Sequence, residues 1–474
     1  MSSFNKYLSR PKANPQVKDK YERLFLKDNP FPFDPFLEPD SDNERVNGTI
    51  YCESIKQREI NLFEEHFFAQ DLNSNHRRLG YLIDSSYTGR GNGKSALLVH
   101  LQKEINADYG FKFSNGLNKI FSLYVKPEPS GQTVRFWQLS HLLINRLTKM
   151  TVLTDCIISL VYDYALQELG NEVLDKHLVV EDDFKNLLDY KFLSSIGLSE
   201  FDMKARLESL LVGKGVERSL VHAILRSRLD PEQGLSQYVS SKNEGVQKKE
   251  MSFIFFDQLV RIFIASGFNG CCIFFDEFEK MVDAQKQSER NDFAAELRHN
   301  LLEGRALGPV VGFYMMVLAM HPGVPSLITE SWEKSGINVR CPLPGQALGI
   351  EQPHTVFFNN LQKENVRAML EEYIKFYRTT EQHDNPLYPF AVDAVDYISE
   401  AASFNAAKSL KMAYNVLEKM AASDASIIDE QFVKSVIEDN QQIFTADSEN
   451  PNLLEKKNNS PLKGILFGHT KKGE

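Results

Sequence analysis

The stretch that decides the fold reads LGYLIDSSYTGRGNGKSALLV, at residues 79–99. Its first six residues are an apolar run that predicts a buried strand, and its last residues favour a helix. Between them, GRGNGKS at 89–95 places three glycines within five residues. Glycine costs backbone entropy, so this density indicates a backbone that adopts positive φ or approaches a ligand closely. Strand, glycine loop and helix in this order predict a phosphate-binding loop.

A phosphate cradle needs converging backbone N–H groups with a helix N-terminus behind them. We expect Lys94 to reach the β- and γ-phosphates of ATP, and the Ser95 hydroxyl to ligate Mg²⁺. The residues expected to bind the nucleotide here are Gly89, Arg90, Gly91, Asn92, Gly93, Lys94, Ser95 and Ala96. The loop departs from strict G-x-x-x-x-G-K-[ST] spacing, because Thr88 stands where the first glycine belongs. A flexible surface turn is the alternative, but it does not account for the lysine and serine that follow.

The second half of such a site is a buried strand that ends in carboxylates, and GCCIFFDEFEK at 270–280 fits this pattern. We expect Asp276 to hold Mg²⁺ through water and Glu277 to polarise the water that attacks the γ-phosphate. Glu277 and Lys94 are therefore the expected catalytic residues. A strand end that merely leaves the core is the alternative.

Composition limits the class of protein. The chain has 474 residues, of which 42% are hydrophobic and 25% charged, as in average globular proteins. It shows no apolar run of about 18 residues and no signal-peptide core, so we expect a cytoplasmic protein without a membrane segment. The net charge of −10 argues against a protein that coats nucleic acid by bulk charge. Five cysteines without CxxC spacing predict reduced thiols.

The pattern along the chain predicts an α/β fold with four parts. These are an extended N-terminal arm at 1–49, whose Phe residues pack onto a domain; a parallel-sheet domain at 50–350, with a helical insertion at about 133–268; a helical domain at 351–445; and a basic flexible tail at 446–474. A helix is predicted from Glu53 to Gln70. Further strands are predicted in 119–127, 270–280 and 309–323, with INVRCPL at 337–343 closing the sheet.

Two short features suggest contact with nucleic acid. In the insertion, Gly213 and Gly215 separate two amphipathic stretches, which resembles a helix-hairpin-helix that grips the DNA backbone. Ser219 and His222 depart from that motif, and a plain helical turn is the alternative. In the tail, the lysines expected to contact a partner or nucleic acid, without supporting the fold, are Lys456, Lys457, Lys463, Lys471 and Lys472.

The two phosphate-site motifs, followed by a helical domain, resemble the AAA+ ATPases. Within that superfamily the chain is most similar to the branch of origin-recognition ATPases, transposon target-selection ATPases and the P-loop proteins of phage-defence operons. The resemblance covers roughly residues 50–445, although only the two motifs are specific. It implies a P-loop NTPase core with a C-terminal lid, ATP and Mg²⁺ held between sheet domain and lid, and a homo-oligomer that forms on ATP binding.

The resemblance also implies residues that sense the γ-phosphate. The sensor after the fourth strand falls on His321 in VLAMHPG, where an ordinary loop histidine is the alternative. The second sensor, usually an arginine, falls in SFNAAKSL; Ala407 holds its place, which leaves Lys408 or Lys411 as substitutes. The candidates for an arginine finger acting in trans are Arg298, Arg305 and Arg340, each of which also fits an ordinary surface arginine. These departures affect hydrolysis more than nucleotide binding.

The expected function is a Mg-ATP-dependent ATPase that serves as regulatory or motor subunit of a DNA-directed assembly, in antiviral genome defence or DNA modification. No nuclease, methylase or protease constellation appears, so protein partners encoded nearby would carry further chemistry. A nucleotide-dependent signalling switch without DNA contact is the alternative, although no repeat array is visible. A replication initiator would need a winged-helix domain after the lid, for which too few residues remain.

Overall fold

The computed structural model describes residues 20–68, 78–85, 91–127, 133–226, 230–242, 250–303, 312–345, 354–379 and 385–439. The predicted tail, the loop residues Gly89 and Arg90, and Arg305 lie outside the described residues. The chain divides into two compact units. We call them the helical unit (Met1–Gln57, Thr88–His100 and Asn359–Glu474) and the sheet unit (Arg58–Tyr87 and Leu101–Phe358). No helix among the described residues combines the length and the apolar character needed to cross a bilayer.

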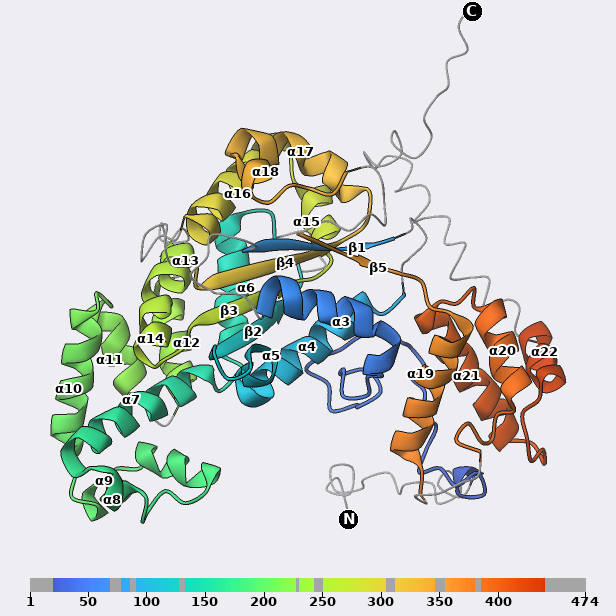
Figure 1. The fold of residues 1–474 in the computed structure, drawn as a ribbon, viewed down its shortest axis with the longest axis horizontal. Helices are drawn as coiled ribbons and strands as arrows, with labels where there is room; N and C mark the ends of the chain where they lie inside the picture. The colour runs from blue at the N-terminus through green and yellow to red at the C-terminus, as the bar shows by residue number, and fades with distance from the viewer. Residues whose placement is uncertain are drawn as a thin grey trace, which may run out of the picture. The chain divides into compact units, whose positions relative to one another are not determined.

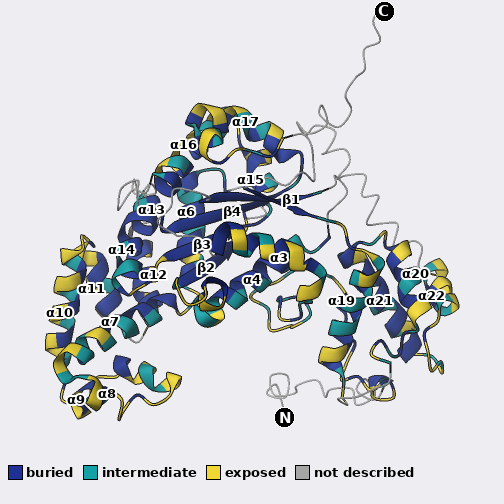
Figure 2. Cartoon of the chain, viewed as in Figure 1, coloured by how far each residue is buried: buried dark blue, intermediate teal, exposed yellow. Residues whose placement is uncertain are grey.

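The sheet unit contains one five-stranded, entirely parallel sheet, which confirms the predicted α/β class (Figure 1). Its strands are β1 (Leu79–Asp84), β2 (Ile120–Val125), β3 (Gly270–Phe275), β4 (Tyr314–Met320) and β5 (Thr355–Phe358), in the spatial order β2-β3-β4-β1-β5. Every strand residue is buried (Figure 2). Burial on both faces explains why the strands read as continuous apolar runs rather than as alternating patterns.

Strands β1 to β4 lie within the runs predicted to form them, but the predicted closing strand at 337–343 is wrong. Its first residues form the short helix α18 (Ile337–Arg340), which Gly336 initiates with a φ of 72°. The sheet is closed instead by β5, which pairs with β1 and lies within the range predicted for the helical domain. Both segments are short apolar runs, and periodicity alone cannot separate a strand from a buried helical turn at that length.

Helices cover both faces of the sheet. On one face, Tyr81 of β1 donates its hydroxyl hydrogen to the Cys341 carbonyl at 2.9 Å and accepts from the indole N–H of Trp332 at 2.9 Å. On the other face lie α3 (Gln57–Phe63) and the π-helical turn η2 (Glu64–Phe68), within the helix predicted at 53–70. A Cβ on Gly80 would come within 2.1 Å of the Phe67 ring, so only glycine fits at this position of β1.

The described residues between 133 and 268 form helices and turns and contain no strand. Their elements are α6 (Phe136–Leu147), α7 (Val152–Leu169), α8 (Asn171–Leu174), η3 (Glu181–Leu188), α9 (Tyr190–Ser195), α10 (Glu200–Gly213), α11 (Arg218–Arg226), α12 (Pro231–Lys242), α13 (Glu250–Phe253), η5 (Ile254–Leu259) and α14 (Val260–Ala265). Their apolar side chains share one hydrophobic core with the sheet. The insertion is therefore packed as part of the sheet unit.

Four further elements follow β3 and β4 in the sheet unit. They are α15 (Phe278–Ala284), α16 (Gln287–Leu297), the π-helical turn η6 (Arg298–Leu302) and α17 (Val324–Ser335). Phe278 and Trp332 belong to the same core as Leu79 and Ile83 of β1. These helices thus cover the sheet face that carries the odd-numbered residues of β1, because successive side chains of a strand point to opposite faces.

The helical unit has a separate core, built from α19 (Lys363–Tyr377), α20 (Val392–Ala401), α21 (Ala406–Ala421) and α22 (Glu430–Asp439). The N-terminal arm joins this core through Tyr21, Leu24 and Phe31. Phe31 is fully buried, and its ring lies 6.2 Å from that of Tyr373. The arm therefore packs onto the C-terminal helices through Phe31, whereas Phe33 and Phe36 of the same arm are exposed.

Candidate functional site

The glycine loop leads into α4 (Lys94–Asp108), whose first turn contains Lys94, Ser95 and Ala96. Strand β1 ends at Asp84, so the predicted order of strand, loop and helix is present. Gly91 and Gly93 have φ values of 87° and 95°, which side-chain-bearing residues rarely adopt. The first-turn N–H groups of a helix lack intrahelical partners and can bind an anion. The described part of the loop thus places two glycines of positive φ directly before a helix N-terminus.

The two loop glycines differ in their surroundings. Among the described residues, a Cβ on Gly93 would have no atom within 4 Å, whereas a Cβ on Gly91 would lie 2.8 Å from Asn405 Oδ1. The Gly91 carbonyl accepts a hydrogen bond from the Ala407 N–H at 3.0 Å. Gly91 is therefore packed against the N-terminus of α21, while the backbone at Gly93 faces open space.

Two asparagines extend this contact within the helical unit. Asn92 is buried and donates from Nδ2 to Asn360 Oδ1 at 2.6 Å. Asn405 caps α21, because its side chain accepts from the Lys408 N–H at 3.1 Å, and its Nδ2 lies 3.5 Å from Asn92 Oδ1. Sequence reasoning missed Asn360 and Asn405. The second had a local signal, since asparagine before an alanine-rich helix is a preferred N-cap.

The second-sensor candidates lie at the start of the same helix. Lys408 is exposed on the first turn of α21, and Lys411 follows three residues later, so the two occupy one face. Ala407, which holds the expected sensor position, contacts Gly91 through its backbone N–H. The structure thus brings the turn SFNAAKSL to the glycine loop within the helical unit.

In the sheet unit, Asp276 directly follows β3 and is 3% exposed. Its Oδ2 accepts from the Tyr124 hydroxyl at 2.7 Å, and its Oδ1 accepts from the Glu277 N–H at 2.9 Å. Two donors therefore fix the orientation of this carboxylate. Sequence reasoning missed Tyr124, although it lies in the run that predicted β2, the neighbour of β3.

Glu277 has φ 51° and ψ 38°, the left-handed conformation, and precedes α15. For a residue with a Cβ this backbone costs about 1–2 kcal/mol, and such strain persists where surrounding structure imposes it. The turn breaks the strand alternation that would otherwise point Asp276 and Glu277 in opposite directions. The Glu277 carboxylate forms an ion pair with Lys280.

His321 follows the last residue of β4, and its Nδ1 accepts from the Gly323 N–H at 3.2 Å. Strand β4 pairs with both β1 and β3. The carboxyl ends of three adjacent parallel strands thus carry Asp84, Asp276 and His321. The connection that follows β1 runs to β2 at one edge of the sheet, and the connection that follows β4 runs to β5 at the other edge. Ligands of open α/β sheets bind where neighbouring strands connect in opposite directions in this way.

The described arginine-finger candidates differ in how they are held. Arg298 donates from Nη1 to the Ser335 carbonyl at 2.6 Å, and its Nε lies 2.8 Å from Glu303 Oε1. Arg340 is exposed at the end of α18. Arg298 is thus bound within its own unit, whereas Arg340 points a charged group to solvent.

The predicted DNA-binding hairpin has the expected backbone, with Gly215 at φ 89° between α10 and α11. However, Glu208 lies 3.1 Å from both Arg218 and His222, and Arg261 donates to the Lys214 carbonyl at 2.9 Å. These contacts favour the plain helical turn, because Arg218 and Arg261 beside the turn already have acidic or carbonyl partners, although Lys214 within the turn is exposed.

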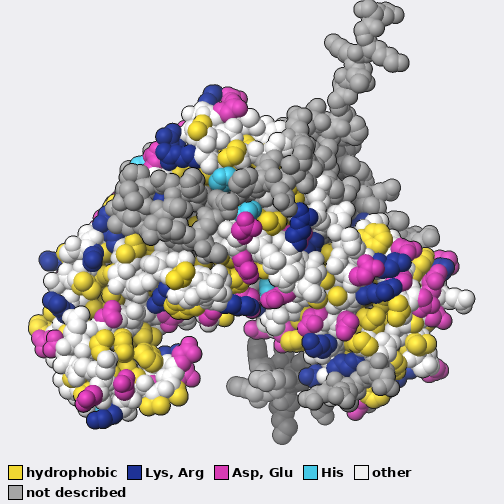
Figure 3. All heavy atoms as spheres, in the orientation of Figure 1, with side chains coloured by type: hydrophobic (Ala, Val, Ile, Leu, Met, Phe, Trp, Pro, Cys, Tyr) yellow, Lys and Arg dark blue, Asp and Glu magenta, His cyan; other side chains and the backbone are white. Residues whose placement is uncertain are grey.

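Charge on the drawn face agrees with this interpretation. Figure 3 shows Lys and Arg side chains interspersed with Asp and Glu, and no continuous basic stripe among the described residues on that face. Nucleic-acid-binding surfaces usually cluster their cations.

Neither the models of known protein families nor the curated proteins gave a match to this chain. A function for this chain is therefore inferred from its residues and their geometry.

Proposed function

We propose that the chain is a P-loop ATPase similar to the AAA+ proteins, which binds ATP with Mg²⁺ at GRGNGKS and hydrolyses it. The observation that supports this most is the local backbone: β1 ends at Asp84, Gly91 and Gly93 adopt positive φ, and a 15-residue helix begins at Lys94. This arrangement presents backbone N–H groups and the positive end of a helix dipole to an anion.

The residues from Gly93 to Ala96 have separate roles in the proposal. The N–H groups from Gly93 to Ala96 bind phosphate oxygens, and Lys94 neutralises the β- and γ-phosphates. The open space beside Gly93 leaves room for that anion. The Ser95 hydroxyl and the Asp276 carboxylate are assigned to Mg²⁺, because hydroxyl and carboxylate oxygens are the ligand types that this ion prefers.

Hydrolysis is assigned to Glu277, which would accept the proton of the attacking water. His321 and Lys408 are assigned to sensing the γ-phosphate, by their places after β4 and at the start of α21. The left-handed turn at Glu277 supports this role, because strained non-glycine residues cluster at functional sites.

The biological role is proposed on the family resemblance alone: a regulatory or motor subunit of a DNA-directed assembly in genome defence or DNA modification, working with protein partners and assembling on ATP binding. The contacts of Glu208 with Arg218 and His222 in the α10–α11 hairpin weaken the DNA part. A nucleotide-dependent switch without DNA contact therefore stays as the second candidate.

The test is equilibrium binding of a fluorescent ATP analogue in Mg²⁺ to the full chain and to Lys94→Ala. Binding should be lost, because the lysine is the cation that the loop brings to the phosphates. Lys112→Ala is the control, since Lys112 is an exposed lysine that pairs with Glu104. Equal binding by wild type and Lys94→Ala would overturn the nucleotide site.

ATPase activity measured with and without duplex or single-stranded DNA separates the two candidate roles. Stimulation by DNA supports the DNA-directed assembly. Turnover that is indifferent to DNA, combined with ATP-dependent assembly, favours the switch.

A further inference from the structure

The N-terminal arm borders an open cavity in the helical unit, with a volume of about 410 Å³. Residues between 28 and 46 form most of its wall, and Tyr414 and Glu418 of α21 complete it. Its lining residues are Asp28, Asn29, Phe31, Pro32, Phe33, Asp34, Phe36, Glu38, Asn43, Arg45, Val46, Tyr414 and Glu418. We call this cavity the arm pocket. Its size falls within the range of sites that bind small ligands or side chains.

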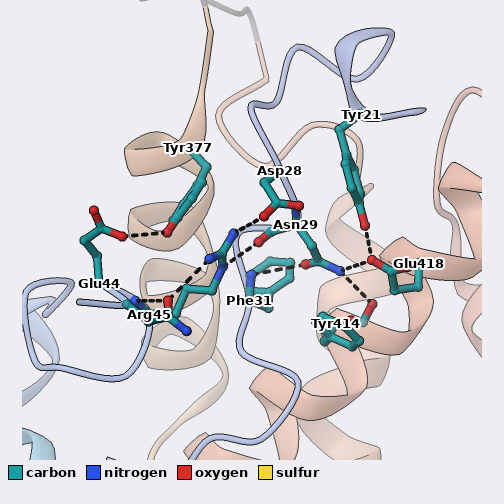
Figure 4. Close-up of polar contacts among 10 residues, drawn as sticks. Tyr21, Asp28, Asn29, Phe31, Glu44, Arg45, Tyr377, Tyr414 and Glu418 are labelled. Atoms are coloured by element: carbon teal, nitrogen blue, oxygen red, sulfur yellow. Dashed lines mark hydrogen bonds and ion pairs between the residues drawn. The ribbon is translucent and has the colours of Figure 1, made fainter. Parts of the chain in front are cut away.

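Buried polar contacts hold the wall of the arm pocket in place. Asn29 is 3% exposed, and its Nδ2 donates to Glu418 Oε1 at 3.0 Å and to the Tyr414 carbonyl at 3.2 Å. Its Oδ1 accepts from the Phe31 N–H at 3.1 Å. Tyr21 also donates to Glu418, as Figure 4 shows. A buried amide with both ends bonded fixes the arm on α21 in one arrangement.

Two aromatic side chains of the arm stay outside this packing. Phe33 is 66% exposed and Phe36 is 74% exposed, although Phe31 beside them is fully buried. The Phe33 ring meets the Tyr414 ring edge-on at 5.4 Å. Large aromatic groups left exposed around a cavity indicate a binding surface.

The arm pocket is also negatively charged. Asp28 and Glu418 are already paired, with Arg45 and Lys20 respectively. The carboxylates of Asp34 and Glu38 are exposed, and neither forms an ion pair or hydrogen bond with another described residue. Charge and aromatic surface together suit a cation and repel phosphate groups.

The arm itself shows how such groups hold a guanidinium. Arg45 lies 4.2 Å above the Tyr377 ring centroid and pairs with Asp28 Oδ2 at 2.8 Å. A planar guanidinium combines stacking on an aromatic face with paired hydrogen bonds to a carboxylate, which an ammonium group does less well. Asp34 and Glu38 line the same pocket as Phe33 and Phe36, so a guanidinium bound there would meet both kinds of group.

We propose that the arm pocket binds an arginine-bearing segment of a protein partner, with its guanidinium against Asp34 and Glu38 and flanking apolar side chains against Phe33 and Phe36. This site lies on the arm and α21 and needs no nucleotide, so it goes beyond the proposed ATPase function.

The test begins with the full chain and a random heptapeptide phage library. We expect selection for peptides that contain arginine next to apolar residues. A selected peptide, labelled with fluorescein, is then compared with its citrulline form by anisotropy. The citrulline form should bind about tenfold more weakly or worse, and added salt should weaken the arginine form. No selection for arginine, or equal binding of both forms, would overturn the proposal.

Two double variants locate the site, namely Phe33→Ser with Phe36→Ser, and Asp34→Asn with Glu38→Gln. Both change exposed side chains, so the melting temperature should stay nearly constant while peptide affinity falls about tenfold or more. The matched control is Phe201→Ser, because Phe201 is 80% exposed and lies in the sheet unit. Binding of the ATP analogue should be unchanged in all of them, which separates this proposal from the nucleotide site.

The same variants test a competing occupant. If wild type self-associates with rising concentration in light scattering and the double variants do not, the pocket binds a second copy of the chain, and the peptide proposal fails. Peptide binding that survives both double variants would likewise place the site elsewhere.

Discussion

The Tyr124 hydroxyl donates a hydrogen bond of 2.7 Å to Asp276 Oδ2, and both groups are buried. Tyr124 lies opposite Phe274 in the register of the parallel strands β2 and β3. The hydroxyl thus reaches the carboxylate that follows the end of β3. Tyr124 is a positioning residue for the acid that we assign to Mg²⁺.

Replacing Tyr124 by Phe should raise the Mg²⁺ concentration needed for half-maximal ATP hydrolysis, because Asp276 loses one of the two donors that orient it. Stability should fall by about 1.5–3 kcal/mol, the usual value of a hydrogen bond to a charged group. Tyr314→Phe is the matched control: its buried hydroxyl donates to the Phe255 carbonyl at 2.7 Å, at the opposite end of the sheet. The assignment fails if both variants show the same Mg²⁺ dependence.

Substitutions of Asp276 and of Glu277 should have different effects on ATP binding and hydrolysis. Asp276→Ala should weaken both ATP affinity and turnover, because it removes the carboxylate that we expect to hold Mg²⁺ through water. Glu277→Gln keeps size and hydrogen bonding but cannot take the proton from water, so ATP should bind and stay uncleaved. With ATP, this variant should elute from size exclusion as a larger species than wild type. Hydrolysis by Glu277→Gln at the wild-type rate would contradict the catalytic role.

Glu277→Gly separates backbone strain from catalysis. Glycine removes the cost of the left-handed φ of 51°, although it also makes the unfolded chain more flexible. We therefore expect the free energy of unfolding to rise or to stay within about 0.5 kcal/mol, while hydrolysis is lost. Denaturant titration and an ATPase assay measure the two effects. A clear loss of stability would show that the Glu277 side chain supports the fold.

Gly91→Ala should destabilise the protein more than Gly93→Ala. Both glycines have positive φ, but only at Gly91 would the new Cβ approach Asn405 Oδ1, at 2.8 Å. We expect a loss of stability of about 1 kcal/mol at either site, because alanine disfavours positive φ, and a further loss of about 1–3 kcal/mol from overpacking at Gly91. Thermal unfolding of the two variants measures the difference. Equal stabilities would mean that Asn405 moves away from the new Cβ at little cost in free energy.

Asp155→Asn should change how stability depends on pH. Burial raises the pKa of Asp155 in the folded protein, despite hydrogen bonds from Tyr109 and Thr151 that lower it. At pH values between the pKa of Asp155 in the unfolded chain and its higher pKa in the folded protein, the folded state binds more protons than the unfolded state. The stability that protonated Asp155 contributes is therefore lost as the pH rises through this range. The stability of Asp155→Asn relative to wild type should therefore increase from about pH 4 to about pH 7. Denaturant titrations at both pH values test this, and a constant difference would contradict it.

Much of the fold was predictable from local pattern. The runs that form β1 to β4 are long, continuous and apolar, because strands buried on both faces need no polar alternation. The glycine loop was predictable as well, since positive φ at Gly91 and Gly93 has a direct signature in residue type. The fifth strand was misplaced because INVRCPL and TVFF are short runs with no period to distinguish them.

The remaining features depend on residues distant in sequence. The sequence alone determined that a glycine loop stands between a strand and a helix, and that Asp276 ends a buried strand. Only the tertiary structure decided that Tyr124 orients Asp276, that Asn405 packs on Gly91, and that Phe31 is buried while Phe33 is exposed. The physical reason is that turn conformation and strand burial are encoded by neighbouring residues, whereas a side chain's hydrogen-bond partner and exposure are set by whichever distant segment packs against it.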